Sequence, residues 1–209
     1  MANADTPFGL KPIGSGASSV STGKVVPMYL PSDYATSVFI GDPVIKVAAG
    51  SNDVAVTVIG GGTFEIGTLP EVNVVAVGDT NEITGVVVGF LPTTRDSAIY
   101  GAASTTRVAL VNIDPYQEYL IQADGAVPAS SVGLNAVLIA THSGSTTTGL
   151  SGMELDTTSD APAADASNQL LITRMYNAPD NETNLIHNKV IVRVNISTEA
   201  ATRAGLLGI

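Results

Sequence analysis

The sequence predicts an all-β protein with very little helix, and three observations lead to this prediction. Short runs rich in Val, Ile and Thr recur along most of the 209 residues. Clusters of Gly, Pro, Asn, Asp and Ser separate these runs, which is typical of barrels and sandwiches. No long helical segment is visible between them. We therefore expect a single β domain of the barrel or sandwich kind.

Residues 1–19 are expected to form an extended N-terminal arm. Pro and Gly are too frequent there for a helix or a central strand. A fully extended segment of this length reaches roughly 60 Å. Four apolar side chains stand isolated in it: Phe8, Leu10, Pro12 and Ile13. A frayed terminus is the alternative interpretation, but a solvated tail has little use for such side chains, so we expect them to contact a partner protein.

The β domain is expected to span residues 20–196. Alternation is clearest in 189–195, where Val190, Val192 and Val194 share one face. Near the middle of the chain, Tyr119 and Ile121 share a face that we expect to be buried. The expected strands are 25–29, 37–40, 43–48, 54–58, 74–77, 84–91, 107–112, 118–123, 136–140, 153–155, 169–176 and 189–195.

Two further segments have a different character. Residues 141–166 are rich in Ser, Thr, Gly, Asp and Ala, and we expect a long loop excursion with one short strand inside it. Residues 197–209 form a C-terminal tail, in which Ser197 or Thr198 is suited to cap one short helix. We find no convincing internal repeat.

Charge and composition exclude several classes of protein. The net charge is −10, and the nine basic residues are scattered, whereas nucleic-acid binding needs clustered Lys and Arg. The apolar runs are too short to span a bilayer. Charged residues make up 13% of the chain, about half the usual share. A low-charge surface of small residues is typical of a protein packed against other subunits, with a compact soluble β protein as the alternative.

The first residues and the absence of Cys indicate where the chain is made. Residues 1–10 have neither the basic region nor the apolar region of a signal peptide. The chain contains no Cys, so it has no disulfides to form in an oxidising compartment. We expect synthesis in the cytoplasm.

The residues that carry chemistry form no recognisable catalytic motif. The only two histidines, His142 and His187, each stand in a polar loop context. A Ser-His-Asp set is compatible with the counts, but no Gly-x-Ser-x-Gly elbow is present. Residues 14–19 stop one residue short of the dinucleotide fingerprint, and no P-loop lysine follows. We therefore expect no enzyme activity, no catalytic residues and no cofactor, with a hydrolase as a minor alternative.

An acidic cluster in the loop excursion is the best candidate for metal binding in the sequence. Its spacing is not that of an EF-hand, and Pro162 together with nearby alanines indicates a slack loop. We expect a solvated acidic face and no metal site, with calcium binding in 154–165 as the alternative. The acidic residues are Glu154, Asp156, Asp160 and Asp165.

Six segments spread along nearly the whole chain carry a resemblance to a known family. They are MANADTPFGLKP (1–12), FIGDPV (39–44), DPYQEYLIQADG (114–125), VGLN (132–135), GSTTTGLS (144–151) and KVIVRVN (189–195). Together they resemble tailed-phage structural proteins of the head cement or decoration kind, which are often encoded beside a major capsid protein. Residues 46–82 match least, and the stretch after Asn195 departs from the family pattern.

The resemblance implies a β-barrel or jelly-roll body with an extended arm that holds capsomers together. The expected function is therefore that of a virion structural protein on the outer surface of the capsid. Its partners would be the major capsid protein and further copies of itself, as a homodimer or homotrimer, without nucleic acid or membrane. The alternative is a phage or cell-surface module that binds carbohydrate or the host. Lack of Trp argues mildly against that alternative.

Overall fold

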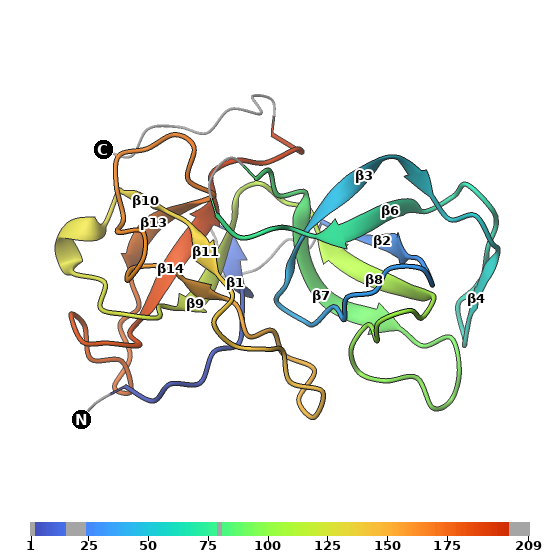
Figure 1. Ribbon diagram of the computed structural model, residues 1–209, viewed down its shortest axis with the longest axis horizontal. Coiled ribbons are helices and arrows are strands. Elements are labelled where there is room, and N and C mark those ends of the chain that lie inside the picture. The colour runs from blue at the N-terminus through green and yellow to red at the C-terminus, as the bar shows by residue number, and fades with distance from the viewer. Residues whose placement is uncertain (1–2, 16–23, 79–80, 201–209) are drawn as a thin grey trace.

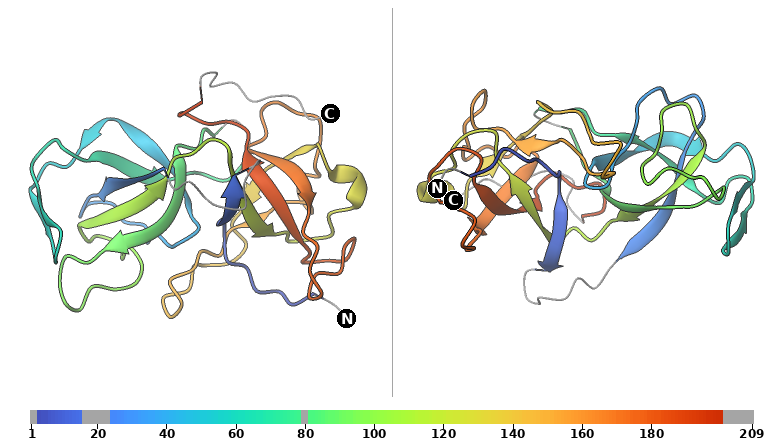
Figure 2. Two further views of the ribbon diagram at one scale, coloured as in Figure 1. Left: turned by 180° about the vertical axis from the view of Figure 1, so that it is seen from behind. Right: turned by 90° about the horizontal axis from the view of Figure 1, so that it is seen from below.

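A computed structural model describes residues 3–15, 24–78 and 81–200, and it confirms the all-β prediction. The strands belong to two bodies that lie side by side (Figures 1 and 2). Within the described residues, the only helical element is a single 3₁₀ turn, Ala129–Ser131. None of the described helical structure is long and apolar enough to cross a membrane.

One body is a closed barrel with the strand order β2-β6-β3-β7-β8. All neighbouring strands are antiparallel except β2 and β6. Val and Met side chains fill its interior, including Met28, Val72 and Val87, all fully buried. A small hairpin of β4 (Val56–Val58) and β5 (Gly62–Phe64) extends from one end. The barrel strands are β2 (Val25–Leu30), β3 (Pro43–Ser51), β6 (Pro70–Val74), β7 (Gly85–Leu91) and β8 (Arg107–Asn112).

The second body, called the sheet body below, is an antiparallel sheet with the order β1-β9-β14-β13-β10. A two-stranded sheet of β11 (Leu138–Ile139) and β12 (Glu154–Leu155) packs beside it. The five strands are β1 (Lys11–Ser15), β9 (Gln117–Gln122), β10 (Asn135–Ala136), β13 (Leu170–Met175) and β14 (Lys189–Val194).

The core of the sheet body is shared with the barrel. The expected faces of β9 and β14 are buried, since Tyr119, Ile121 and the three alternating valines of β14 all lie inside. Three residues from the barrel side complete this core: Val75, Ile83 and Val86. The two bodies are therefore one packing unit at their contact.

A tight loop at Ile40–Gly41, called the junction loop, joins the two bodies. Gly41 O accepts a hydrogen bond from Leu10 N at 2.9 Å, and Gly41 N donates to Val87 O at 2.8 Å. Gly41 has φ +97°, and a Cβ there would lie 2.7 Å from Phe8 O. Only glycine allows both the conformation and this approach of two backbones. Ile40 also pairs with Leu150, from the loop between β11 and β12.

The N-terminal segment, residues 3–15, differs from the expected extended arm. Residues 11–15 form β1, which pairs with β9, and Leu10 is fully buried in the sheet-body core. Pro12 is compatible with a strand here because β1 lies at the sheet edge, where one side of the strand needs no ladder partner. Residues 16–19 lie outside the described residues.

Most other expected strands are present within one to three residues, with local differences. Residues 37–40 form isolated bridges through Val38 and Ile40 instead of a strand. The strand expected at 74–77 lies earlier, at Pro70–Val74, and Gly62–Phe64 was not expected. Residues 197–200 contain no helix, because their backbone bridges to Ile83 of the barrel side. Residues 201–209 lie outside the described residues.

Candidate functional site

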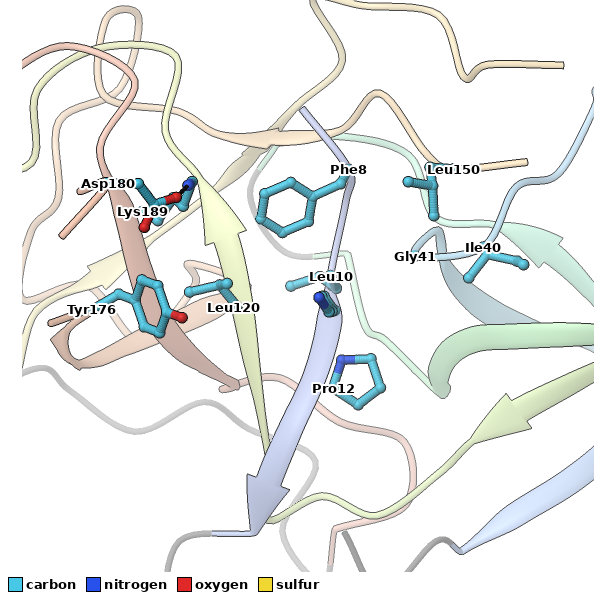
Figure 3. A pocket seen from close by; sticks show the side chains of 11 residues that line it. Phe8, Leu10, Pro12, Ile40, Gly41, Leu120, Leu150, Tyr176, Asp180 and Lys189 are labelled. Carbon is cyan, nitrogen blue, oxygen red and sulfur yellow. Dashed lines mark hydrogen bonds and ion pairs between the residues drawn. The ribbon is translucent and has the colours of Figure 1, made fainter. Parts of the chain in front are cut away.

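Three of the four predicted interface residues line one surface groove, and Ile13 does not. Phe8 and Pro12 are partly exposed there (Figure 3). Leu10 also lines it but is fully buried in this chain's own core. Leu10 is therefore corrected from a partner-binding anchor to a core residue, because its side chain is already packed within the chain.

The groove has a volume of about 490 Å³ and is mostly apolar. It lies along the seam between the bodies, since β1 and β9 border it from one side and the junction loop and Leu150 from the other. Leu150 is 37% exposed. The apolar lining residues are Phe8, Leu10, Pro12, Ile40, Leu120 and Leu150.

One end of the groove is polar. Tyr176 lies there beside an ion pair in which Lys189 Nζ is 2.5 Å from Asp180 Oδ2. Lys189 donates a hydrogen bond to Asp180 and lowers the pKa of that carboxyl. The groove thus combines an apolar trough with a fixed charged rim, which is the usual make-up of a recognition pocket.

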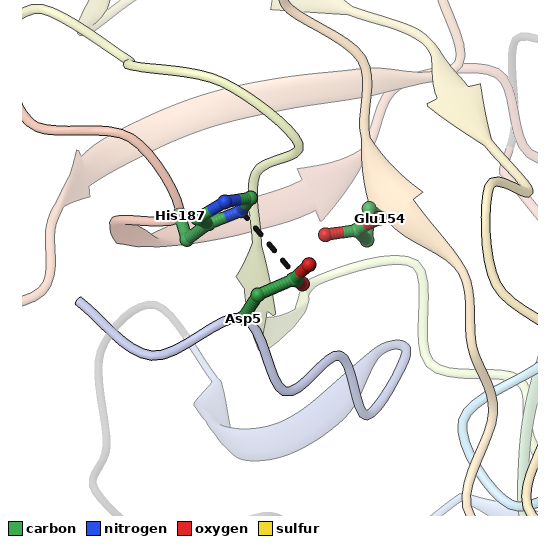
Figure 4. Close-up of side chains that lie close together, drawn as sticks. All are labelled: Asp5, Glu154 and His187. Atoms are coloured by element: carbon green, nitrogen blue, oxygen red, sulfur yellow. Dashed lines mark ion pairs between the residues drawn. The ribbon is translucent and has the colours of Figure 1, made fainter.

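The second candidate site is a cluster of carboxylates and imidazoles beside the N-terminal segment. Ligand atoms of Asp5, Glu154 and His187 all lie within 4.8 Å of one another (Figure 4). Asp5 lies between the two histidines, with Oδ1 3.8 Å from His187 Nδ1 and Oδ2 3.6 Å from His142 Nε2. His142 Nδ1 is 3.0 Å from Glu154 Oε2. We call these four residues the carboxylate–histidine cluster.

Side-chain amides hold Asp5 in this place. Asn3 Nδ2 donates to Glu182 O and Ile186 O, and Asn3 Oδ1 accepts from Glu182 N. Gln122 of β9 donates to Ala4 O at 2.6 Å and accepts from Thr6 N at 2.9 Å. Both neighbours of Asp5 are thereby fixed to the sheet body.

The other members of the cluster come from separate elements. Glu154 belongs to β12, and its side chain is only 1% exposed. His187 has φ +57°, an unusual conformation for a residue with a side chain. Its backbone is fixed at both ends, since His187 N donates to Gly125 O and Gln122 Nε2 donates to His187 O.

The two histidines and Glu154 stand out in the sequence, but nothing there predicts that they lie together. His142 and Glu154 are only twelve residues apart, but His187 and Asp5 come from distant parts of the chain, and no spacing pattern links the set. The other acidic residues of 154–165 do not lie with Glu154 in a group of potential metal ligands. Within the described residues, the only such group is Asp5, Glu154 and His187. Asp156 instead accepts backbone N–H groups from Thr158 and Ser159, which closes its own loop.

Asp42 is a buried carboxyl next to the junction loop. Burial raises its pKa to about 6, although hydrogen bonds from Ser151 and from Phe39 N partly oppose this shift. The Phe39 N to Asp42 Oδ2 distance is 2.7 Å. We therefore expect the stability of the junction between the bodies to depend on pH.

Comparison of the chain with protein-family models, with curated proteins and with solved structures found no match in any of the three.

Proposed function

We propose that this chain is a phage virion structural protein of the cement or decoration type, which binds the outer surface of the capsid and stabilises the head lattice. The observation that carries the proposal is the apolar groove at the seam between the two bodies. Its partly exposed wall includes Phe8, Pro12 and Leu150. The proposed occupant is an apolar segment of the major capsid protein.

Size and composition support this occupant. A volume of about 490 Å³ accommodates a few side chains and not a whole domain. Anchor side chains that fill such pockets usually supply most of the binding energy of a protein interface. The net charge of −10 favours a position on the outer surface, away from packaged DNA.

The mechanism follows from mass action. A protein that binds the assembled lattice and not the free subunits stabilises the lattice by linkage. A modest groove is sufficient if several copies, joined as a dimer or trimer, engage neighbouring capsid subunits at once, because linked weak contacts multiply in strength.

Co-sedimentation with purified, expanded phage heads tests the proposal. The wild-type chain should bind at a fixed ratio of copies per capsid subunit and raise the temperature at which heads are disrupted. Leu150→Ser should weaken binding about fivefold or more, since truncation of an anchor side chain at an interface costs more than about 1 kcal/mol. The matched control is Ile66→Ser, because Ile66 is 66% exposed and does not line the groove. Equal binding by both variants would exclude the groove as the contact, and no binding by wild type would exclude the function.

A carbohydrate-binding function is the second candidate, because Tyr176 lies beside the Asp180–Lys189 pair in the groove. Sugars stack on aromatic rings, and their hydroxyl groups donate hydrogen bonds to carboxylates and accept them from ammonium groups. A glycan array separates the two candidates: saturable binding that is lost in Tyr176→Ala, together with no binding to heads, would favour the carbohydrate function.

A further inference from the structure

Two buried polar atoms of the carboxylate–histidine cluster have no hydrogen-bond partner. They are Glu154 Oε1 and His187 Nδ1. The other carboxylate oxygen, Glu154 Oε2, has two partners: Thr141 Oγ1 donates a hydrogen bond to it, and His142 Nδ1 lies 3.0 Å away. Burying a carboxylate oxygen without a partner is costly, so such an atom in a folded protein calls for an explanation.

The orientation of the Glu154 carboxylate explains why these two buried atoms have no hydrogen-bond partner. The Glu154 carboxylate points toward Asp5 and His187 (Figure 4), and one ligand atom from each residue lies within 4.8 Å of the others. Two carboxylates at this separation repel each other. A divalent cation between them would remove the repulsion and give both orphaned atoms a partner.

We propose that Asp5, Glu154 and His187 bind a divalent transition metal of the Zn²⁺ class. Zn²⁺ takes imidazole nitrogen and carboxylate oxygen at about 2.0–2.2 Å, which places tetrahedral ligands about 3.4 Å apart. The His187 Nδ1 to Asp5 Oδ1 distance of 3.8 Å is close to this value. Asp5 has a 41% exposed side chain, so it can move inward to complete the site. Ca²⁺ fits less well, because it prefers six to eight oxygen ligands.

His142 is a positioning residue in this site. Its Nδ1 contact fixes the Glu154 carboxylate so that Oε1 faces the metal position. Hydrogen bonds to a ligating carboxylate orient it, and their loss typically weakens metal binding 10- to 100-fold. The imidazole thus acts on the metal through Glu154.

Metal binding would fasten the N-terminal segment to the sheet body. Asp5 belongs to that segment, whereas Glu154 and His187 belong to the body. The same segment supplies Phe8 and Pro12 to the groove. The metal site is nevertheless independent of the proposed function, because it is measured on the isolated chain without heads.

Isothermal titration of the chelator-stripped full chain tests the site. We expect one Zn²⁺ per chain and a much weaker response to Ca²⁺ and Mg²⁺. Co²⁺ serves as a spectroscopic probe, because a protein-bound Co²⁺ ion of low coordination number absorbs visible light far more strongly than the hydrated ion does. Amide exchange of residues 3–8 should slow when Zn²⁺ is added.

Zn²⁺ binding is also measured on variants of the cluster, at both exposed and buried positions. Asp5→Asn and Glu154→Gln should each weaken Zn²⁺ binding about 100-fold or more, and His142→Gln about 10- to 100-fold. Asp5 is exposed, so Asp5→Asn should fold even if Glu154→Gln does not. Asp165→Asn, in the acidic loop outside the cluster, should bind as the wild type does. The proposal is overturned if the wild type binds no Zn²⁺ at one per chain, if Ca²⁺ binds equally well, or if Asp5→Asn binds unchanged.

Discussion

The barrel and the sheet body are built from the chain in opposite ways. The barrel uses one continuous stretch, from β2 to β8, and closes on itself so that none of its five strands is an edge. The sheet body collects strands from both ends of the chain, so that Lys11 of β1 pairs with Leu120 of β9. Its order leaves β1 and β10 at the edges.

This difference locates the candidate sites. Both the groove and the carboxylate–histidine cluster use the N-terminal segment, which completes the sheet body from outside. The barrel contributes Ile40 and Gly41 to the groove and Val75, Ile83 and Val86 to the shared core. The core of the sheet body is therefore completed by residues of the barrel and by residues of the N-terminal segment.

Leu10→Ala should lower the free energy of unfolding most, and it should destabilise the sheet body more than the barrel. Leu10 is fully buried, and truncation of such a leucine costs about 2–5 kcal/mol of unfolding free energy. Denaturant unfolding measures the loss, and amide exchange locates it. Exchange should accelerate in β9 and β14 while the barrel amides stay protected.

The matched control for Leu10→Ala is Met28→Ala, at a fully buried position inside the barrel. It should accelerate exchange in both bodies, because opening the barrel also uncovers the shared core. Identical exchange patterns in the two variants would mean that the bodies unfold as one unit. Deletion of residues 1–15 should likewise destabilise the sheet body, because it removes β1 and the buried Leu10.

Gly41→Ala tests the junction between the bodies. A Cβ at Gly41 would lie 2.7 Å from Phe8 O, and φ is +97°. The left-handed backbone costs an alanine about 1–2 kcal/mol, and the clash adds about 1–2 kcal/mol more. Gly67→Ala is the control, because Gly67 has φ +77° with nothing within 4 Å. Thermal melts should show the larger loss for Gly41→Ala, and equal losses would remove the steric argument.

The sequence predicted the fold class because strand periodicity and turn residues are local signals. β8 was predicted with the observed bounds, and β2, β7, β9 and β14 within one residue at each end. β1 was missed because Pro12 and the surrounding glycines indicate an irregular segment, whereas its pairing partner lies more than a hundred residues away. Division of the strands into two bodies depends on such distant pairings, which periodicity does not reveal.

The candidate sites were predicted only in part. Phe8 and Pro12 were expected to contact a partner because they stand isolated in a Gly- and Pro-rich segment. Both line the groove, and their contact with a partner stays a prediction. The role of Leu10 was misassigned, since the same reasoning does not distinguish a partner's surface from the chain's own core. No metal site was expected from the sequence, because the acidic residues of 154–165 lack the spacing of an EF-hand. Asp5, Glu154 and His187 share no spacing pattern that would have linked them. Their proximity arises only when the N-terminal segment docks on the sheet body.

Asp42 is expected to make the junction sensitive to pH. Its pKa in the folded chain is about 6, above the ordinary value of 3.8, so the folded state binds more protons between these values. The free energy of unfolding should therefore fall as pH rises from about 4 to about 6, by about 3 kcal/mol at most. Asp42→Asn should remove this part of the pH dependence. Denaturant titrations of both proteins across this range measure the difference, and parallel curves would show that Asp42 does not cause it.

The ion pair between Lys46 of β3 and Glu199 should have the smallest effect. The two side chains are 39% and 24% exposed, with Nζ 2.7 Å from Oε1. Partly solvated pairs contribute about 0.2–1 kcal/mol and weaken in salt. A double-mutant cycle with Lys46→Ala and Glu199→Ala, measured by denaturant unfolding at low and high salt, gives the coupling energy. This pair links the barrel to the segment after β14, so a coupling above about 1 kcal/mol would mean that charge helps to hold the bodies together. A smaller, salt-sensitive value would leave the shared apolar core and the junction loop as the main connections.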